Sequence, residues 1–138
     1  METLLNFTEA KKLNRNSDDS FKGSSLFKVV FGIMREWELT QEELATILNK
    51  PPSTISEWKK NKFIPFSKRP TNDEYQIIQF IEFYKLLSDF FASIEDRTSW
   101  IRDKNKALGE ASPFEFIKVN PPRNLALLND LIRRLANP

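Results

Sequence analysis

The chain has 138 residues, 40% of them hydrophobic, which is enough to bury the core of one domain or of two small domains sharing a core. It contains neither cysteine nor histidine, which excludes disulfides, thiolate chemistry and the usual histidine-based catalytic groups and metal ligands. The formal net charge is only +2, and no apolar run approaches the roughly 18 residues of a membrane span. We therefore expect a cytoplasmic protein without enzymatic activity, metal or cofactor.

The first two segments differ sharply in composition. Residues 1–22 are polar and of mixed charge, and we expect them to form a mobile arm. In residues 24–37, apolar side chains recur at a spacing of four, which predicts a helix with Ser24 or Ser25 as its N-cap. Because no alternation of period two persists anywhere in the chain, the predicted fold class is all-α.

The most informative stretch, TQEELATILNKPPSTISEW, follows this helix. Thr40 and Glu43 have the spacing of a capping box, which predicts the start of a helix. Asn49 tolerates the left-handed conformation of a tight turn, and the Pro-Pro pair ends one helix and suits the first turn of the next. Two short helices joined by a tight turn are the minimum arrangement that presents a helix end to a DNA groove. The predicted helices are 40–49 and 52–60.

This stretch resembles the helix-turn-helix of the Xre/Cro/repressor-like family. The residues that carry the resemblance are Thr40-Gln41-Glu42-Glu43-Leu44-Ala45, Leu48-Asn49 and Ser53-Thr54-Ile55-Ser56-Glu57-Trp58. The chain departs from the family pattern at Asn49, where glycine is usual, and at Pro51-Pro52, where polar residues are usual. The second departure removes a possible base-reading side chain at position 52.

The second helix of the pair has one apolar and one polar face. Ile55 and Trp58 lie three positions apart and would face inward, with the polar residues on the opposite face. Ser53 and Glu57, near the N-terminal end of that face, are the candidates for base readout. The other candidate DNA-binding residues, chiefly for phosphate contacts, are Gln41, Lys50, Thr54, Ser56, Lys59, Lys60 and Lys62.

Charge supports DNA binding as the function of this segment. The span Lys50–Arg69 holds six basic residues and one acid on a chain that is otherwise nearly neutral. A local basic block of this kind is typical of phosphate contact. The same residues would also suit an ordinary solvated helix face.

A linker and a long helix come next. Residues 61–70 contain two prolines, and their apolar side chains would pack against the bundle. Thr71 and Glu74 form a second capping-box pattern that opens a helix with apolar residues on more than one face. Such a helix is central to a fold or half of an interface, and we expect both roles, since a DNA-binding helix-turn-helix usually works as a dimer.

The C-terminal segment predicts three short helices around a tryptophan. Asp96 or Thr98 is expected to start the first, which carries Trp100. Gly109 is a helix C-cap signal, Ser112-Pro113 is a helix start signal, and the Asn-Pro-Pro run that follows predicts a break. The last two predicted helices are 113–118 and 123–136.

This order of signals resembles the toxin-binding domain of Xre/MbcA/ParS-type antitoxins. The matching residues are Trp100, Ile101, Asn105, Leu108, Gly109, Ser112, Pro113, Phe116 and Leu131. The chain departs from the family at Glu110-Ala111, where a second glycine is usual, and at Pro121-Pro122, which replaces a glycine-containing turn.

The resemblance implies the antitoxin of a type II toxin–antitoxin system of the RES–Xre kind. Such a protein covers the active site of a RES-type, NAD-consuming toxin and represses its own operon by binding operator DNA as a homodimer. The implied segments are a mobile arm (1–22), a helix-turn-helix domain (23–68), a connecting and dimerisation helix (69–94) and a toxin-binding domain (95–138). The implied toxin-binding residues are Trp100, Leu108, Gly109, Ser112, Pro113, Leu131, Arg133 and Arg134.

Three alternatives stay open. Arg133 and Arg134 would suit an acidic or phosphate-recognising cleft of the toxin, but the last helix could equally close the core and leave them solvated. The chain could be a phage-type or plasmid-type repressor without a toxin, with residues 71–138 serving only for dimerisation. It could also be a protein-interaction module whose helix-turn-helix no longer binds DNA, which Pro51-Pro52 and the near-neutral charge favour slightly.

Overall fold

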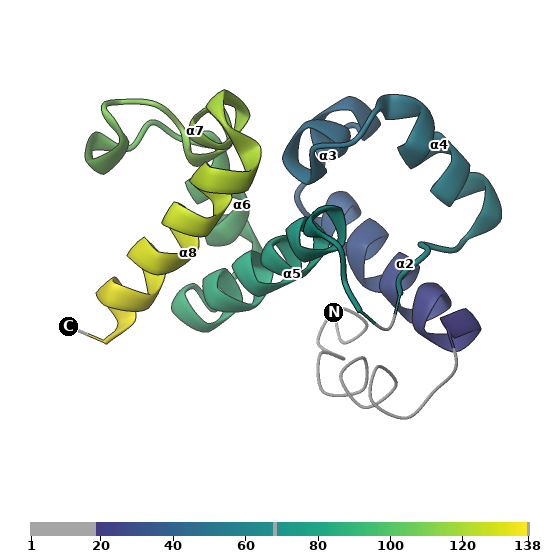
Figure 1. Ribbon diagram of the computed structural model, residues 1–138. Helices are drawn as coiled ribbons and strands as arrows, with labels where there is room; N and C mark the ends of the chain where they lie inside the picture. Colours follow the sequence, from purple (N-terminus) through teal and green to yellow (C-terminus); the bar gives the residue numbers. More distant parts are fainter. Residues whose placement is uncertain (1–18, 68, 138) are drawn as a thin grey trace.

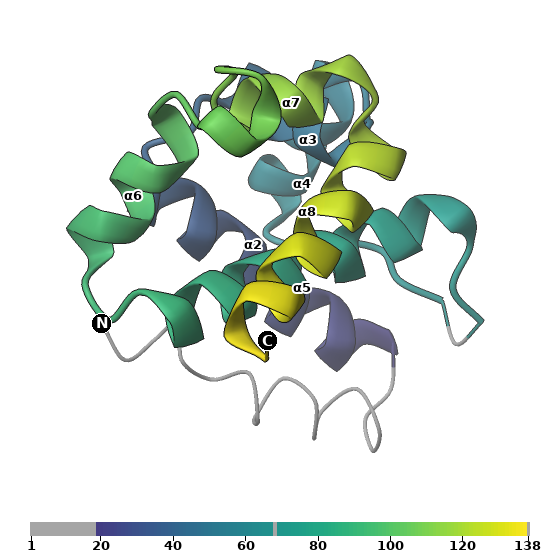
Figure 2. The same cartoon turned by 90° about the vertical axis from the view of Figure 1, so that its left-hand side faces the viewer.

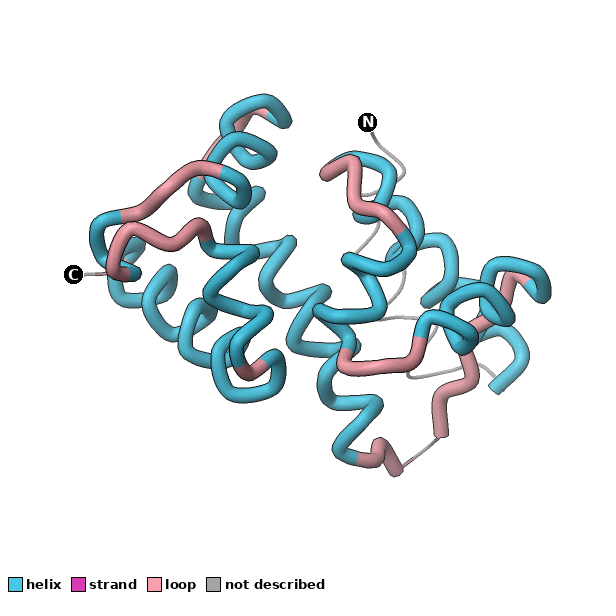
Figure 3. The backbone as a smooth tube through the Cα atoms, turned by 90° about the horizontal axis from the view of Figure 1, so that it is seen from above, coloured by secondary structure: helices cyan, strands magenta, loops and turns pink. Residues whose placement is uncertain are grey.

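The computed structural model describes residues 19–67 and 69–137, and within these ranges the chain forms helices joined by short loops, as the prediction of an all-α fold requires (Figures 1 and 3). The elements are α2 (Asp19–Glu36), α3 (Gln41–Leu48), α4 (Pro52–Asn61), α5 (Asn72–Phe90), α6 (Ile94–Arg102), the 3-10 helix η2 (Lys106–Leu108), α7 (Pro113–Val119) and α8 (Pro121–Ala136). The expected mobile arm lies outside the described residues, apart from its last four, which open α2.

The helix-turn-helix forms as the local signals predict. The Thr40 hydroxyl accepts a hydrogen bond from the Glu43 amide, and a Glu43 carboxylate oxygen accepts one from the Thr40 amide, both at 3.0 Å. Asn49 ends α3 in the left-handed region, with φ 58° and ψ 46°. Pro52 occupies the first turn of α4. The capping box, the turn and the proline start are therefore confirmed.

The predicted start of the first helix was wrong, because α2 begins at Asp19 and continues through Ser24 and Ser25. Gly23 is a weak helix former, so helix propensity alone does not predict that the helix extends through this residue. The fold explains the glycine, since a Cβ at that position would collide with the Phe63 ring. The Gly23 carbonyl also accepts a hydrogen bond from the Ile64 amide, at 3.1 Å, which ties the segment after α4 to α2.

Helix α5 is the centre of the molecule. It runs between the group α2, α3 and α4 and the group α6, α7 and α8 (Figure 1). A second capping box, between Thr71 and Glu74, starts it as predicted. Its inner face packs against Trp37. The ring centroid of Trp37 lies 5.5 to 5.9 Å from those of Phe80, Phe83 and Tyr84. The buried apolar residues of both groups form one core cluster around this helix.

The C-terminal helices differ from the prediction at two starts. Helix α6 begins at Ile94, not at Asp96 or Thr98, because Ser93 caps it by accepting a 3.0 Å hydrogen bond from the Asp96 amide. Helix α8 begins at the Pro-Pro pair that was expected to break the chain before residue 123. Proline is compatible with a first helical turn, where the missing N–H would have no helical partner.

Trp100 does not occupy the centre of a separate C-terminal group. It is only partly buried and packs on α5, with ring centroids 6.3 Å from Phe83 and 6.2 Å from Phe91. Helices α5 and α8 lie side by side and run in the same direction (Figure 2). Gln76 of α5 bonds to the start of α8, and Asn129 in the middle of α8 donates to the side-chain oxygen of Gln79, one turn further along α5. Gln76 of α5 connects α3 to α8, because its side chain donates to the carbonyls of Ile47 and Pro121, at 2.9 and 3.0 Å.

A buried ion pair also connects the group α2, α3 and α4 to the group α6, α7 and α8. Glu36 of α2 and Arg97 of α6 lie 3.3 Å apart, with side chains 4% and 5% exposed. The Tyr84 hydroxyl of α5 donates to the other oxygen of Glu36 at 2.8 Å. Burial first, and then this hydrogen bond, raise the pKa of Tyr84 from 10.0 to about 12.

Tyr84 should therefore make stability depend on alkaline pH. The neutral phenol is favoured in the folded state, so its contribution to the free energy of unfolding is complete below pH 10.0 and is lost as the pH rises towards about 12. In Tyr75→Phe, which leaves Tyr84 as the single tyrosine of the chain, near-ultraviolet absorbance should show ionisation close to pH 12 in the folded protein. The urea-unfolded chain is the control, and ionisation at the same pH in both states would contradict this account.

Candidate DNA-binding and partner-binding surfaces

Helix α4 has the two faces that a recognition helix needs. Ile55 is fully buried and Trp58 is 6% exposed, so both anchor the helix to the core. Ser53, Ser56 and Glu57 are exposed on the opposite face. The structure thus leaves the candidate base-reading side chains accessible, and their contact with DNA stays a prediction.

The first turn of α3 is joined to this outer face. The Ser56 hydroxyl donates a hydrogen bond to the side-chain carbonyl of Gln41, at 3.2 Å. This bond uses the side-chain oxygen of Gln41 and not its NH₂ group. The NH₂ group is a donor of the kind that contacts a phosphate or a base edge. Two residues that are far apart in the sequence therefore form one polar unit, which sequence spacing alone did not reveal.

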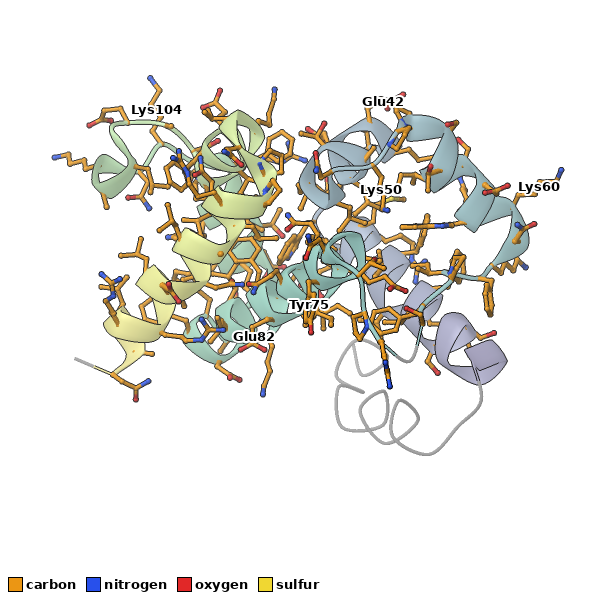
Figure 4. The ribbon with its side chains drawn as sticks, viewed as in Figure 1. Glu42, Lys50, Lys60, Tyr75, Glu82 and Lys104 are labelled. Atoms are coloured by element: carbon orange, nitrogen blue, oxygen red, sulfur yellow. The ribbon has the colours of Figure 1, made fainter. Side chains whose placement is uncertain are left out.

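The candidate phosphate-binding residues fall into two groups. Lys59, Lys60 and Lys62 are exposed at the C-terminal end of α4, and Lys60 points away from the body of the protein (Figure 4). Thr54 and Lys50 are only partly exposed; Lys50 borders a hollow of about 430 Å³ at the turn. The strongest basic surface is therefore the end of α4. The exposed acid nearest to these lysines in the sequence is Glu57, on α4 itself, and Glu42 is exposed at the upper edge of α3 in the same view.

The candidate toxin-binding residues before α8 lie at different depths. Ser112 and Pro113 are buried; Ser112 caps α7 and Pro113 opens it. Trp100 and Leu108 are partly buried, and Gly109 is exposed, with a φ of 68° that ends η2. Ser112 and Pro113 thus shape the fold, and direct contact with a partner is open to the other three.

The candidates on α8 face different ways. Arg133 forms an ion pair with Glu82 of α5 at 3.3 Å and a second one with Asp130 of its own helix at 3.0 Å. Arg134 is exposed, and Leu131 is partly buried at the helix edge. Of the two arginines, Arg134 is the one that can bind a partner without breaking an ion pair with residues 19–67 or 69–137.

Leu127 and Leu135, which form an apolar edge on α8 together with the candidate Leu131, were missed as candidate toxin-binding residues. Leu127 is 45% exposed and Leu135 is 56% exposed, and Leu131 lies between them at a spacing of four. We call these three residues the α8 leucine edge. The spacing is visible in the sequence, but so is that of Leu125, Leu128 and Ile132, which are buried in the core. Only packing separates the two sets.

The chain is similar in fold to a toxin–antitoxin component. The match is to one chain of the crystal structure of the M. tuberculosis MbcT–MbcA toxin–antitoxin complex, with a TM-score of 0.52 and 18% sequence identity. It covers 79% of this chain and 94% of that chain, so it spans more than the helix-turn-helix. At this identity the likeness establishes the fold. No protein-family model matches the sequence, and no curated protein matches it significantly.

Among the described residues, Asp and Glu side chains do not gather in groups of three that could hold a metal ion. In the same part of the chain, every helix is too short or too polar to cross a membrane.

Proposed function

We propose that the protein is the non-enzymatic antitoxin of a type II toxin–antitoxin pair and that it acts in the cytoplasm. The observation that carries this proposal is the fold, which matches 94% of a chain from a solved toxin–antitoxin complex. In this proposal residues 23–68 bind DNA, 69–94 connect the halves and dimerise, and 95–138 bind the toxin. The order of the helices in the structure supports this division.

The toxin-binding surface is proposed to be the α8 leucine edge. Exposed leucines cost free energy in water, and burying one against a partner contributes about 1.5–3 kcal/mol. Leu127 and Leu135 are free for this role because they lie outside the core. Arg134 would add a cation for an acidic or phosphate-recognising cleft, which suits the proposed RES-type, NAD-consuming toxin. Covering that cleft would neutralise the toxin.

The helix-turn-helix is proposed to bind the operator of the protein's own operon. Ser53 and Glu57 stand on the open face of α4, and three exposed lysines follow at its end. Two copies would place two such faces on successive half-sites of the duplex. On α5, Tyr75 is 53% exposed and Ile78 is 39% exposed, one turn apart, which makes this face the proposed homodimer contact.

Co-expression with the product of the adjacent gene tests the proposal. That product alone should arrest growth, and this chain should restore growth and co-purify with it. The purified chain should also shift its own upstream DNA in a salt-dependent way. Failure to form a complex or to protect cells would refute the antitoxin role. A DNA shift without a complex would instead favour a repressor that has no toxin.

A further inference from the structure

Arg102 lies at the end of α6 and contacts the start of α3. It thereby connects α3 to the C-terminal half of the molecule, which consists of α6, α7 and α8. Its guanidinium donates to both carboxylate oxygens of Glu43, at 2.8 and 3.0 Å. The same group donates to the Glu38 carbonyl at 3.1 Å. Glu38 has a φ of 54°, in the left-handed region that a residue with a side chain seldom adopts. One guanidinium thus holds both the turn before α3 and a carboxylate in its first helical turn.

Glu43 is already part of the capping box. The carboxylate oxygen that accepts the 3.0 Å bond from Arg102 also accepts the Thr40 amide, at 3.0 Å. Arg102 is the largest cause of the lowered pKa of Glu43, so the pair keeps this acceptor ionised. The planar fork of an arginine fixes the orientation of the carboxylate as well as its charge.

The first turn of α3 in turn carries Gln41, the partner of Ser56 on the outer face of α4. The first turn of α3 therefore joins two sets of hydrogen bonds, one from Arg102 to the cap of α3 and one between Gln41 and Ser56 on the face proposed to read DNA. Arg102 and Glu43 are partly exposed, at 36% and 24%, so their ion pair adds little to global stability. Its effect would be on local geometry.

We propose that Arg102 is a positioning residue for operator binding. By holding Glu43 and the Glu38 carbonyl, it sets the orientation of the first turn of α3 and of the Gln41–Ser56 pair. The C-terminal half thereby contributes to DNA affinity without touching DNA. This inference rests on the proposed DNA binding by the helix-turn-helix.

The test measures the affinity of the full chain for its own upstream DNA over a series of salt concentrations. The variants are Arg102→Lys, which keeps the charge but not the fork, and Arg102→Gln. The matched control is Arg133→Gln, which removes one charge from a comparably exposed ion pair between α8 and α5. Both Arg102 variants should bind about threefold to tenfold more weakly than wild type, because an oriented hydrogen-bonding unit is loosened. The control should stay within about twofold.

The salt dependence separates positioning from direct contact. A positioning residue leaves the slope of log K against log[salt] unchanged, whereas each phosphate that the protein no longer binds lowers the magnitude of the slope by about 0.9. Full rescue by Arg102→Lys, a reduced slope or unchanged affinity in both variants would each overturn the inference. Thermal melting monitored by circular dichroism verifies that the variants are folded at the assay temperature. A wild-type chain that binds no upstream DNA would overturn the proposed DNA binding and this inference together.

Discussion

Replacing Leu127 and Leu135 with glutamate is expected to abolish toxin neutralisation while the fold and DNA binding remain. Both side chains are about half exposed, so the substitutions leave the core unchanged. At the proposed interface, however, they would remove two apolar contacts, each contributing about 1 kcal/mol because only half of each side chain remains to be buried, and they would bury two carboxylates. The Kd for the toxin should rise by more than about 100-fold. Growth protection and titration of the purified toxin measure the effect.

The matched control changes Phe90, at the end of α5, and Val119, at the end of α7, to glutamate. These residues are also exposed and apolar, they lie outside both proposed contacts, and the change in charge is the same. Neutralisation that survives in the Leu127 and Leu135 variant would remove the α8 leucine edge from the interface. Loss of neutralisation in the control alone would move the toxin-binding surface to the ends of α5 and α7. Deletion of α8 would be uninformative, because the helix supplies core residues, Leu125, Leu128 and Ile132.

Removing the lysines at the end of α4 should weaken DNA binding on every sequence tested. The variant is Lys59→Ala, Lys60→Ala and Lys62→Asn; asparagine is chosen because Lys62 has a φ of 53°, which asparagine tolerates. Because phosphate contacts carry no base information, affinity for operator and for unrelated DNA should fall together. The magnitude of the salt slope should drop by about 0.9 for each phosphate that the variant no longer binds. Fluorescence anisotropy over a salt series measures both quantities.

The control for net charge changes three other exposed lysines, Lys28, Lys104 and Lys106, to glutamine. An equal loss of affinity in the two triple variants would mean that only total charge matters. An unchanged slope in the α4 variant would exclude these lysines as phosphate ligands.

Features set by neighbouring residues were predictable. Each capping box is a pair of residues three positions apart, Thr40 with Glu43 and Thr71 with Glu74. Two residues are therefore enough to locate each of these helix starts from the sequence. Asn49 likewise marks a turn through its own backbone preference. Two helix starts were predicted wrongly because two local signals competed. Ser93 competed with Asp96 as the cap of α6, and Pro121-Pro122 could either break a helix or begin one.

The sequence by itself determined the all-α class, the capping-box starts of α3 and α5 and the inward face of α4, because hydrogen bonds and side-chain periodicity within a turn or two control them. Only the tertiary structure decided which leucines of α8 are buried, and that Arg133 faces α5 while Arg134 faces solvent. It alone also placed Arg102 against Glu43. These outcomes depend on contacts between residues about 50 or more positions apart, and helical spacing carries no information on which face of a helix meets which neighbour.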